Sequence, residues 1–340
     1  MSATPPPAAP QAALPDPLPN AELHIHVEGA LQPELLVRLA ARNGVALPTA
    51  DVEALRSRYV FADLQSFLDV HYANLQVLRA EQDFYDLAAS YLAHARARGV
   101  RRAEVFIDPQ VHMGNGVPLE AVMNGYGAAF DEARAAGQSC DIIMCFLRDL
   151  GPEAAEEMFR AAMPFRDRII GVGLDSTEVG YPPSLFQRVY AMAAAEGLHR
   201  VAHAGEEGGP EYVREAVDLL GVERVDHGLR ALEDPELVRR LADEQIALTV
   251  CPLSNVALRA VDTMAEHPVR TMLDAGLRVT VSSDDPAYFG GYVEANFAAL
   301  RSEAGLDDDQ LRKLALNSFD ACFIDDVARA GWKAELDTGG

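Results

Sequence analysis

Residues 21–29 read Ala-Glu-Leu-His-Ile-His-Val-Glu-Gly, an apolar run that carries two histidines one residue apart. Side chains of an extended strand alternate between its faces, so the His24 and His26 imidazoles would project together from one face. Imidazole is the commonest protein ligand for zinc, and a catalytic zinc ion typically has three protein ligands and a water molecule. A His-x-His pair alone is more often incidental than metal-binding. Its meaning therefore depends on what the rest of the chain places beside it.

This run is the first of eight β-type segments, which longer helical stretches separate. Most of the segments are nearly continuous apolar runs, as expected for parallel strands that are buried on both faces. The stretches between them are rich in Ala, Leu, Glu and Arg, and several begin with Pro, which is typical of a first helical turn. This alternation predicts an α/β protein with a (β/α)8 TIM barrel. The expected strands are 21–27, 103–107, 141–147, 169–174, 200–204, 224–227, 246–250 and 277–281.

The segment between the first two strands is too long for one crossover helix. We expect extra helices inserted there, over residues 33–43, 50–59, 64–78 and 82–97. Residues 61–68 are amphipathic; packing against the barrel is the expected role of this piece, and a lid over the barrel mouth is the alternative.

The composition bounds the partners and the compartment. With 29 basic and 52 acidic residues the net charge is −23, which argues against nucleic acid or an anionic membrane as a partner and favours a small molecule. The sequence has no apolar run of transmembrane length. It leaves the oligomeric state open, and a homo-oligomer is compatible with it. The four cysteines form no Cys-x-x-Cys pair, which indicates a reducing, cytoplasmic location.

The first residues differ in composition from the rest. Residues 1–18 are rich in Pro and Ala, and the first basic residue is Arg38. Secretory and mitochondrial leaders need basic residues, so we expect a disordered tail here. Residues 19–340 are then expected to form a single barrel domain.

Polar residues follow several of the expected strands directly, where barrel enzymes carry their active sites. Each has a simpler explanation when taken alone: a buried His bonded to a carbonyl, an Asp that caps a helix, or a solvated Glu. Their joint position on one rim favours a common site. The residues are His24 and His26 after the first strand, His203, Glu206 and Glu207 after the fifth, Asp226 and His227 after the sixth, and Asp284 and Asp285 after the eighth.

A zinc set can be assembled from these ends, with nitrogen ligands from His24, His26 and His203 and an oxygen ligand from Asp284. Zinc lowers the pKa of a bound water from about 15.7 to about 7, which would supply hydroxide at neutral pH. Iron, cobalt or manganese would also suit these ligands.

One metal is favoured over two. Barrel hydrolases with such a first strand often bridge two metals with a carboxylated lysine on strand four, whereas both lysines here, Lys313 and Lys333, follow the last strand. A carboxylate such as Glu178 could still bridge. His227 is then free for the chemistry. The remaining histidines, His71, His94, His112, His199 and His267, are interpreted as structural or surface residues, with His112 in doubt.

The ordered motifs resemble the adenosine/adenine deaminase family of the amidohydrolase superfamily, over residues 18–331. This resemblance implies one Zn²⁺ ion per chain and hydrolytic deamination of a 6-aminopurine. The motifs are residues 21–29, 203–206 (His-Ala-Gly-Glu), 226–228 (Asp-His-Gly), 251–255 (Cys-Pro-Leu-Ser-Asn) and 283–286 (Ser-Asp-Asp-Pro).

The resemblance also implies a role for each residue. Glu206 would deliver a proton to N1 of the purine, and a carboxyl group facing an apolar slot has a raised pKa that suits this task. His227 would orient the attacking water and stabilise the developing alkoxide. Asp284 would bind zinc and accept a proton from water, and Asp285 would bond the purine at N7.

Within the family, the sequence is most similar to the adenine deaminase branch, in residues 107–110, 174–180, 251–256 and 284–292. The adenosine branch usually has Asp, which contacts ribose, where this chain has Glu28. It also has a Gly-Asp-Glu type of turn where this chain has residues 177–179, Thr-Glu-Val. Bulkier residues there would leave less room for a sugar.

The expected reaction is therefore zinc-dependent deamination of adenine to hypoxanthine and ammonia, as in purine salvage. The same chemistry on adenosine, a nucleotide or a modified 6-aminopurine is the nearest alternative. A catalytically silent protein that binds zinc and purine is the alternative from another class.

Overall fold

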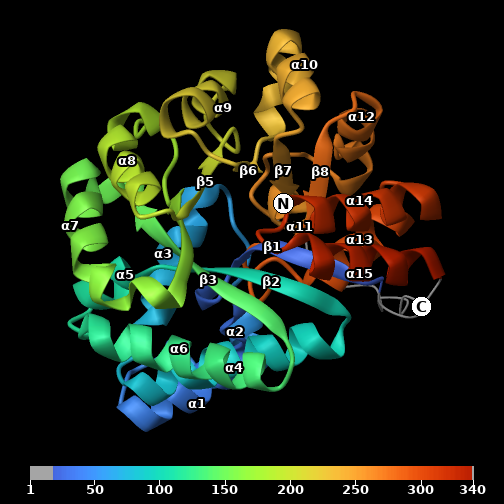
Figure 1. Cartoon of the computed structure of the whole chain (residues 1–340). Coiled ribbons are helices and arrows are strands. Elements are labelled where there is room, and N and C mark those ends of the chain that lie inside the picture. The colour runs from blue at the N-terminus through green and yellow to red at the C-terminus, as the bar shows by residue number, and fades with distance from the viewer. Residues whose placement is uncertain (1–17, 339–340) are drawn as a thin grey trace.

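The computed structural model describes residues 18–338, and its eight strands follow one another in sequence order around a barrel (Figure 1). Every pair of neighbouring strands is parallel. The strands are β1 Asn20–His26, β2 Val100–Ile107, β3 Ser139–Leu147, β4 Ile169–Asp175, β5 His199–Ala204, β6 Arg224–His227, β7 Ala247–Val250 and β8 Arg278–Val281.

The barrel closes between β1 and the residues that follow β8. The His26 N–H donates to the Asp284 carbonyl at 3.0 Å, and the Asp284 N–H donates to the His24 carbonyl at 3.1 Å. The expected (β/α)8 TIM barrel is therefore confirmed. This closure also joins the backbone of two expected metal ligands to that of a third.

Helices surround the barrel, and four of those in the described part of the chain lie between β1 and β2, as expected (Figure 1). Several begin with Pro in the first turn, where its missing N–H costs nothing. The helices are α1 Pro33–Asn43, α2 Val52–Arg56, α3 Leu64–Leu75, α4 Glu81–Ala97, α5 Pro109–Gly114, α6 Leu119–Ala135, α7 Pro152–Ala162, α8 Gln187–Ala195, α9 Pro210–Glu215, α10 Pro235–Glu244, α11 Pro252–Ala257, α12 Val269–Asp274, α13 Val293–Ser302, α14 Asp308–Ala321 and α15 Asp326–Thr338.

Two predicted boundaries are wrong for local reasons. The helix expected over residues 50–59 is only α2: the Asp51 carboxylate caps its start by accepting the Ala54 N–H at 2.9 Å, and the chain leaves the helix in a turn after Arg56. Strand β2 begins at Val100, before the expected 103–107. Charged residues near its start conceal it in the sequence, yet Arg102 is buried and pairs with Asp141 at 2.5 Å.

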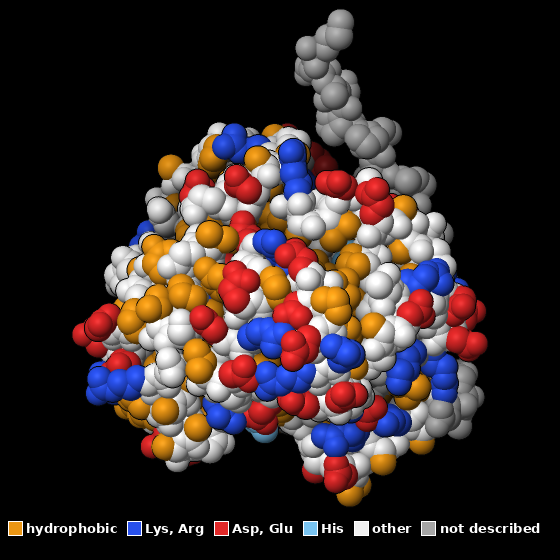
Figure 2. Space-filling model, turned by 90° about the horizontal axis from the view of Figure 1, so that it is seen from above, with side chains coloured by type: hydrophobic (Ala, Val, Ile, Leu, Met, Phe, Trp, Pro, Cys, Tyr) orange, Lys and Arg blue, Asp and Glu red, His pale blue; other side chains and the backbone are white. Residues whose placement is uncertain are grey.

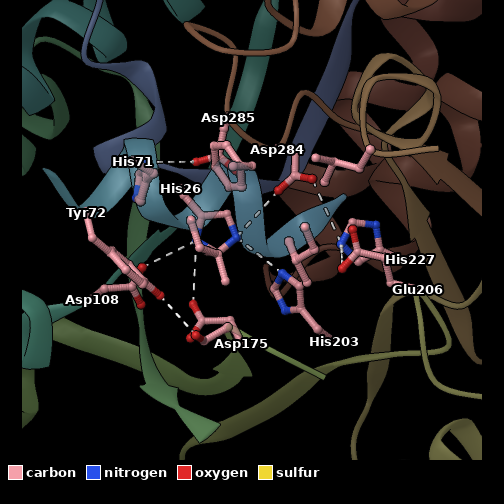
Figure 3. A pocket seen from close by; sticks show the side chains of 15 residues that line it. His26, His71, Tyr72, Asp108, Asp175, His203, Glu206, His227, Asp284 and Asp285 are labelled. Atoms are coloured by element: carbon pink, nitrogen blue, oxygen red, sulfur yellow. Dashed lines mark hydrogen bonds and ion pairs between the residues drawn. The ribbon is translucent and has the colours of Figure 1, made fainter. Parts of the chain in front are cut away.

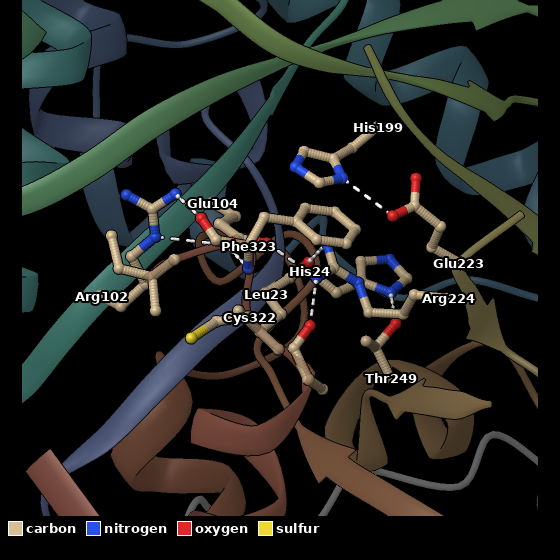
Figure 4. Close-up of polar contacts among 12 residues, drawn as sticks. Leu23, His24, Arg102, Glu104, His199, Glu223, Arg224, Thr249, Cys322 and Phe323 are labelled. Carbon is tan, nitrogen blue, oxygen red and sulfur yellow. Dashed lines mark hydrogen bonds and ion pairs between the residues drawn. The ribbon is translucent and has the colours of Figure 1, made fainter. Parts of the chain in front are cut away.

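Buried ion pairs fill the end of the barrel at which the strands begin (Figure 4). Glu104 lies 2.7 Å from Arg224 and 3.2 Å from Arg102. Burial opposes its ionisation, but the two guanidinium groups hold the pKa of Glu104 below its usual value. The Phe323 N–H, on the loop between α14 and α15, also donates to Glu104 at 2.5 Å. Barrel enzymes carry their active sites at the opposite end, where the strands finish.

On the face shown in Figure 2, acidic, basic and apolar side chains are interspersed, and no large patch of one charge stands out. Within residues 18–338, the helices are too short or too polar to cross a bilayer. The tail expected over residues 1–18 falls, apart from Leu18, outside the described residues.

Candidate active site

Four expected metal ligands meet at the ends of β1, β5 and β8. His24, His26, His203 and Asp284 each offer one ligand atom, and these atoms lie within 4.8 Å of one another. The His26 and His203 Nε2 atoms are 3.2 Å apart, and Asp284 Oδ1 lies 3.3 Å from His24 Nε2 and 3.6 Å from His26 Nε2. A tetrahedron with zinc–nitrogen bonds of 2.0–2.1 Å has edges of about 3.3 Å. The spacing of the four atoms therefore fits one zinc ion.

Hydrogen bonds leave the metal-facing nitrogen of His24 without a proton. Thr249 donates its hydroxyl proton to Asp226 at 2.8 Å, so its oxygen accepts the proton of His24 Nδ1 at 2.9 Å. His24 Nε2 then presents a lone pair, and it is buried with no hydrogen-bond partner among the described residues. A metal ion would satisfy this atom, as the outer hydrogen bond of a ligating histidine usually arranges.

Neighbouring groups and burial also set the protonation of His26, His203 and Asp284. His26 Nδ1 lies 3.6 Å from one oxygen of Asp108 and 3.6 Å from one oxygen of Asp175, so it carries the proton and Nε2 faces the other ligands (Figure 3). Burial, with the neighbouring His24, lowers the pKa of His203 well below its usual value and keeps this imidazole neutral. Burial opposes the ionisation of Asp284, but His24 holds its pKa well below the usual value. Burial opposes the protonation of His26, but Asp108 and the other nearby carboxylates raise its pKa well above the usual value, so a metal ion would displace a proton from this ring.

Another grouping shares two of these atoms and includes the Cys251 thiol and His227. Burial raises the pKa of Cys251 well above its usual value, which disfavours the thiolate that metals bind. The set with His26 and His203 is the better donor set.

Glu206 and His227 face the metal ligands from the ends of β5 and β6 (Figure 3). The Glu206 Oε2 and His227 Nε2 atoms are 3.5 Å apart, and His227 Nε2 is 3.9 Å from Asp284 Oδ2. Burial, and then the charge of Asp284, raises the pKa of Glu206 well above its usual value. Burial also lowers the pKa of His227 to about 3. At neutral pH the site thus holds a protonated carboxyl group beside a neutral imidazole.

A chain of hydrogen bonds fixes the tautomer of His227. The Val269 N–H donates to His267 Nδ1 at 3.3 Å, so His267 Nε2 carries a proton and donates it to Asn255 Oδ1 at 3.1 Å. The Asn255 amide nitrogen then donates to His227 Nδ1 at 3.4 Å. His227 Nε2 therefore carries the proton and is a hydrogen-bond donor toward the pocket.

Asp285 reaches the pocket because Gly29 has no side chain. A Cβ atom on Gly29 would lie 2.0 Å from Asp285 Oδ1. Burial, and then the charge of Asp284, raises the pKa of Asp285 well above its usual value. His227 and Asp284 both have left-handed backbones, with φ of 64° and 63°. Strained backbone of this kind is common where a turn directs a side chain into a site.

The first turns of α3 cover the pocket, whose empty volume is about 430 Å³. Its wall includes Leu64, Phe67 and Leu68 from this helix, and the same side chains pack in one apolar cluster with Tyr288 and Phe289, so residues 61–68 have the expected packing role and also line the pocket. The interpretation of His71 as a structural or surface residue is wrong, because it lines the pocket beside Asp285, with 3.9 Å between His71 Nδ1 and Asp285 Oδ1. Helical spacing alone does not tell a lid from an outer helix.

Two glutamates differ from their expected roles. Glu28 does not line the pocket; its Oε1 accepts from Tyr126 at 2.8 Å and pairs with His112 at 3.1 Å, which makes His112 a structural residue. Glu178 is not available to bridge metals, because its carboxylate accepts four backbone N–H groups of residues 205–208 at 2.6–3.1 Å. It shapes the loop that carries Glu206.

Sequence reasoning missed Asp108 and Asp175, which line the pocket on the side of β2 and β4. Both follow expected strands directly, and this position at the strand ends was the signal that could have identified them. All the expected site residues otherwise converge here: His26, His203, Glu206, His227, Asp284 and Asp285 line the pocket, and His24 is fully buried behind them.

The site and the fold agree with known proteins. The sequence profile of the adenosine deaminase family matches residues 19–338. An adenine deaminase of Streptomyces coelicolor is 59% identical, with 94% of this chain and 95% of that protein covered. An adenine deaminase of Ectopseudomonas mendocina is 56% identical, over 89% of this chain and 97% of that protein.

Solved structures give the same result. The crystal structure of an adenine deaminase from Arthrobacter aurescens superposes with a TM-score of 0.93 at 51% identity and covers 95% of this chain and 98% of that chain. An amidohydrolase from Burkholderia ambifaria with bound zinc has a TM-score of 0.86 at 32% identity, over 94% of this chain and 91% of that chain. This chain therefore belongs to the adenosine deaminase family.

Proposed function

We propose that the protein is a zinc-dependent adenine deaminase, which hydrolyses adenine to hypoxanthine and ammonia with one zinc ion per chain. The observation that carries the proposal is the meeting of four ligand atoms, three of them imidazole nitrogens, beside Glu206 and His227. Relatives named adenine deaminase, at 59% and 56% identity, support the choice of substrate. Buried free cysteines agree with a reducing cytoplasm as the location.

His24, His26, His203 and Asp284 would hold the zinc ion. When bound, zinc lowers the pKa of a water molecule to about 7 and so makes hydroxide available near neutral pH. The unpartnered His24 Nε2 and the low pKa of Asp284 both suit this ion.

The chain's own groups then handle the protons and the purine. Addition of hydroxide to C6 places charge on N1, and Glu206, protonated because burial raises its pKa, donates its proton to N1. His227 donates from Nε2 to the oxygen that adds at C6. Asp285 is protonated for the same reason as Glu206 and donates to N7. The amino group leaves as ammonia with the proton released when the water ionised, and the C6 hydroxyl returns its proton to Glu206 as it becomes the carbonyl of hypoxanthine.

The test follows ammonia and hypoxanthine when adenine is given to chelator-treated protein before and after zinc is restored. We expect activity to return as zinc approaches about one ion per chain. Glu206→Gln should keep the zinc and lose most turnover, because an amide N–H is too weakly acidic to transfer its proton to N1. The matched control is Glu207→Gln, on the same loop and only half-buried, which should remain active.

Two outcomes oppose the proposal. Zinc-loaded protein that released no ammonia from any aminopurine would be a silent zinc and purine binder. Normal turnover by Glu206→Gln would remove that residue from the mechanism.

A further inference from the structure

Two buried carboxyl groups across the pocket from Glu206 face the outer side of His26 and have no contact with the substrate in the mechanism above. Asp108 directly follows β2, Asp175 ends β4, and both line the pocket (Figure 3). Among the described residues, Asp108 Oδ1 is buried without a hydrogen-bond partner, while Asp108 Oδ2 and Asp175 Oδ2 each lie 3.6 Å from His26 Nδ1. Burial, and then the charge of Asp108, raises the pKa of Asp175 well above its usual value, so Asp108 is the ionised member of the pair. Buried polar atoms are nearly always paired, so unpaired acceptors in a pocket point to a donor on its ligand.

A second metal ion is a poor partner for these carboxylates. The group formed by His26, Asp108 and Asp175 has metal-like spacing. However, His26 turns Nε2 toward the first metal set, and the proton on Nδ1 lies between the ring and the carboxylates. A protonated nitrogen has no lone pair for a metal. The free Asp108 oxygen therefore suits an N–H or O–H donor.

The proposed mechanism fixes which edge of the purine they would meet. Glu206 donates to N1 and Asp285 donates to N7, and C6 faces the metal ligands. In Figure 3, Glu206 and His227 lie on one side of His26 and Asp108 lies on the other. The edge that carries N3 and N9 is then directed toward Asp108 and Asp175. Adenine has a donor on this edge, the N–H at N9, whereas a nucleoside has a sugar there instead.

We propose that Asp108 determines specificity for the free base, with its unpaired Oδ1 accepting the N9–H of adenine and Asp175 holding the Asp108 side chain in place. This inference rests on the proposed function and names the part of the site that selects its substrate. A site built to bond a substrate N–H rejects an analogue without it, because the buried acceptors stay unpaired.

Glu28 acts as a positioning residue in this account. Its Oε1 accepts the Asp108 N–H at 3.2 Å, as well as bonds from Tyr126 and His112. These contacts hold the start of the loop after β2, so that the Asp108 side chain faces the pocket. Glu28 thereby affects the end of the pocket that would hold a sugar, although it lies outside the pocket itself.

The experiment compares adenine with 9-methyladenine, in which a methyl group replaces the N9 hydrogen. For the zinc-loaded wild type we expect kcat/KM to be about 100-fold or more higher for adenine. Asp108→Ala removes the acceptor and Asp175→Ala removes the group that holds it, so each should lower kcat/KM for adenine by about 10- to 100-fold and leave that for 9-methyladenine no lower than about one third of its wild-type value. Alanine also makes room for the methyl group, so the hydrogen bond is reported by the loss of kcat/KM on adenine and not by a gain on 9-methyladenine. The matched control is Asp149→Ala, an exposed carboxylate after β3, which should keep the wild-type ratio.

The outcomes separate this inference from the proposed function. Equal losses for both substrates in the Asp variants, or a wild type that deaminates 9-methyladenine as well as adenine, would overturn the inference and leave adenine deamination intact. A wild type inactive on adenine would overturn both. Zinc content is measured for each variant, because loss of metal through His26 would lower both rates together. The wild-type comparison stands even where a variant fails to fold.

Discussion

The Glu178→Gln substitution tests whether one buried carboxylate builds the loop that carries Glu206. The Glu178 Oε1 accepts the Gly205 N–H at 2.6 Å, and Oε2 accepts the N–H groups of Glu206, Glu207 and Gly208 at 3.1, 2.7 and 2.9 Å. Glutamine has nearly the same shape, but one of its terminal atoms is a donor. At least one backbone N–H must therefore face an NH₂ group.

The magnitude follows from these contacts. In its best orientation the glutamine oxygen still accepts the N–H groups of residues 206–208, and the hydrogen bond from the Gly205 N–H is lost. Loss of a hydrogen bond to a charged group costs about 1.5–3 kcal/mol. The three remaining bonds become neutral, and each weakens by about 1 kcal/mol. We therefore expect a loss of about 5 kcal/mol in the free energy of unfolding. This is a large fraction of the about 5–15 kcal/mol typical of a folded domain.

Urea unfolding gives this difference, and kcat for adenine gives the effect on Glu206. We expect a lower unfolding midpoint and a kcat reduced by at least about tenfold, because the loop no longer holds Glu206 in place. Glu207→Gln removes a charge from the same loop without touching these bonds, and its midpoint should stay within about 0.5 kcal/mol of wild type. A Glu178→Gln protein with wild-type stability and activity would refute the reasoning.

Three further changes have distinct readouts. Asp284→Asn exchanges a charged ligand for a neutral amide, so zinc retained against a chelator should fall by about tenfold or more by mass spectrometry, and full retention would contradict the ligand set. His267→Phe removes the donor that orients Asn255, so kcat should fall by about tenfold with zinc retained and KM nearly unchanged, and an unaltered kcat would argue against the tautomer chain. Burial raises the pKa of Glu22 to about 7 from 4.5, so the folded state binds its proton more tightly and stability is lost as pH rises through this range. Between about pH 4.5 and 7, the free energy of unfolding of the wild type should fall by about 3 kcal/mol relative to that of Glu22→Gln, as measured by chemical unfolding at each pH. The same pH dependence in both proteins would contradict this.

The fold and the main site residues could be predicted because their signals are local. Buried parallel strands are apolar runs, and the ends of those runs identify one rim, which carries His24, His203, Asp284 and their neighbours. Strand β2 was placed less well, because Arg102 is charged and yet buried against Glu104 and Asp141. Glu104 lies two residues along the same strand and Asp141 lies on the next one, so the strand's own sequence shows more charge there and does not show that the charges are buried as pairs.

The direction of individual side chains could not be predicted. Glu28 follows His26 in the period of the strand, but a short helical turn begins there and its carboxylate bonds to His112 and Tyr126 instead of facing the pocket. His71 has the helical spacing of a packed residue, and only the position of α3 over the barrel mouth makes it part of the pocket. The directions of these side chains depend on tertiary contacts, which the sequence alone does not show.

The most direct test of the central claim gives the zinc-loaded protein an equal mixture of adenine and adenosine and measures hypoxanthine and inosine by chromatography. At early times the ratio of the products equals the ratio of the two kcat/KM values, without separate assays. We predict that hypoxanthine exceeds inosine by about 100-fold or more, because we infer that Asp108 accepts an N–H that adenosine lacks. Inosine in excess would contradict the assignment of adenine as the substrate.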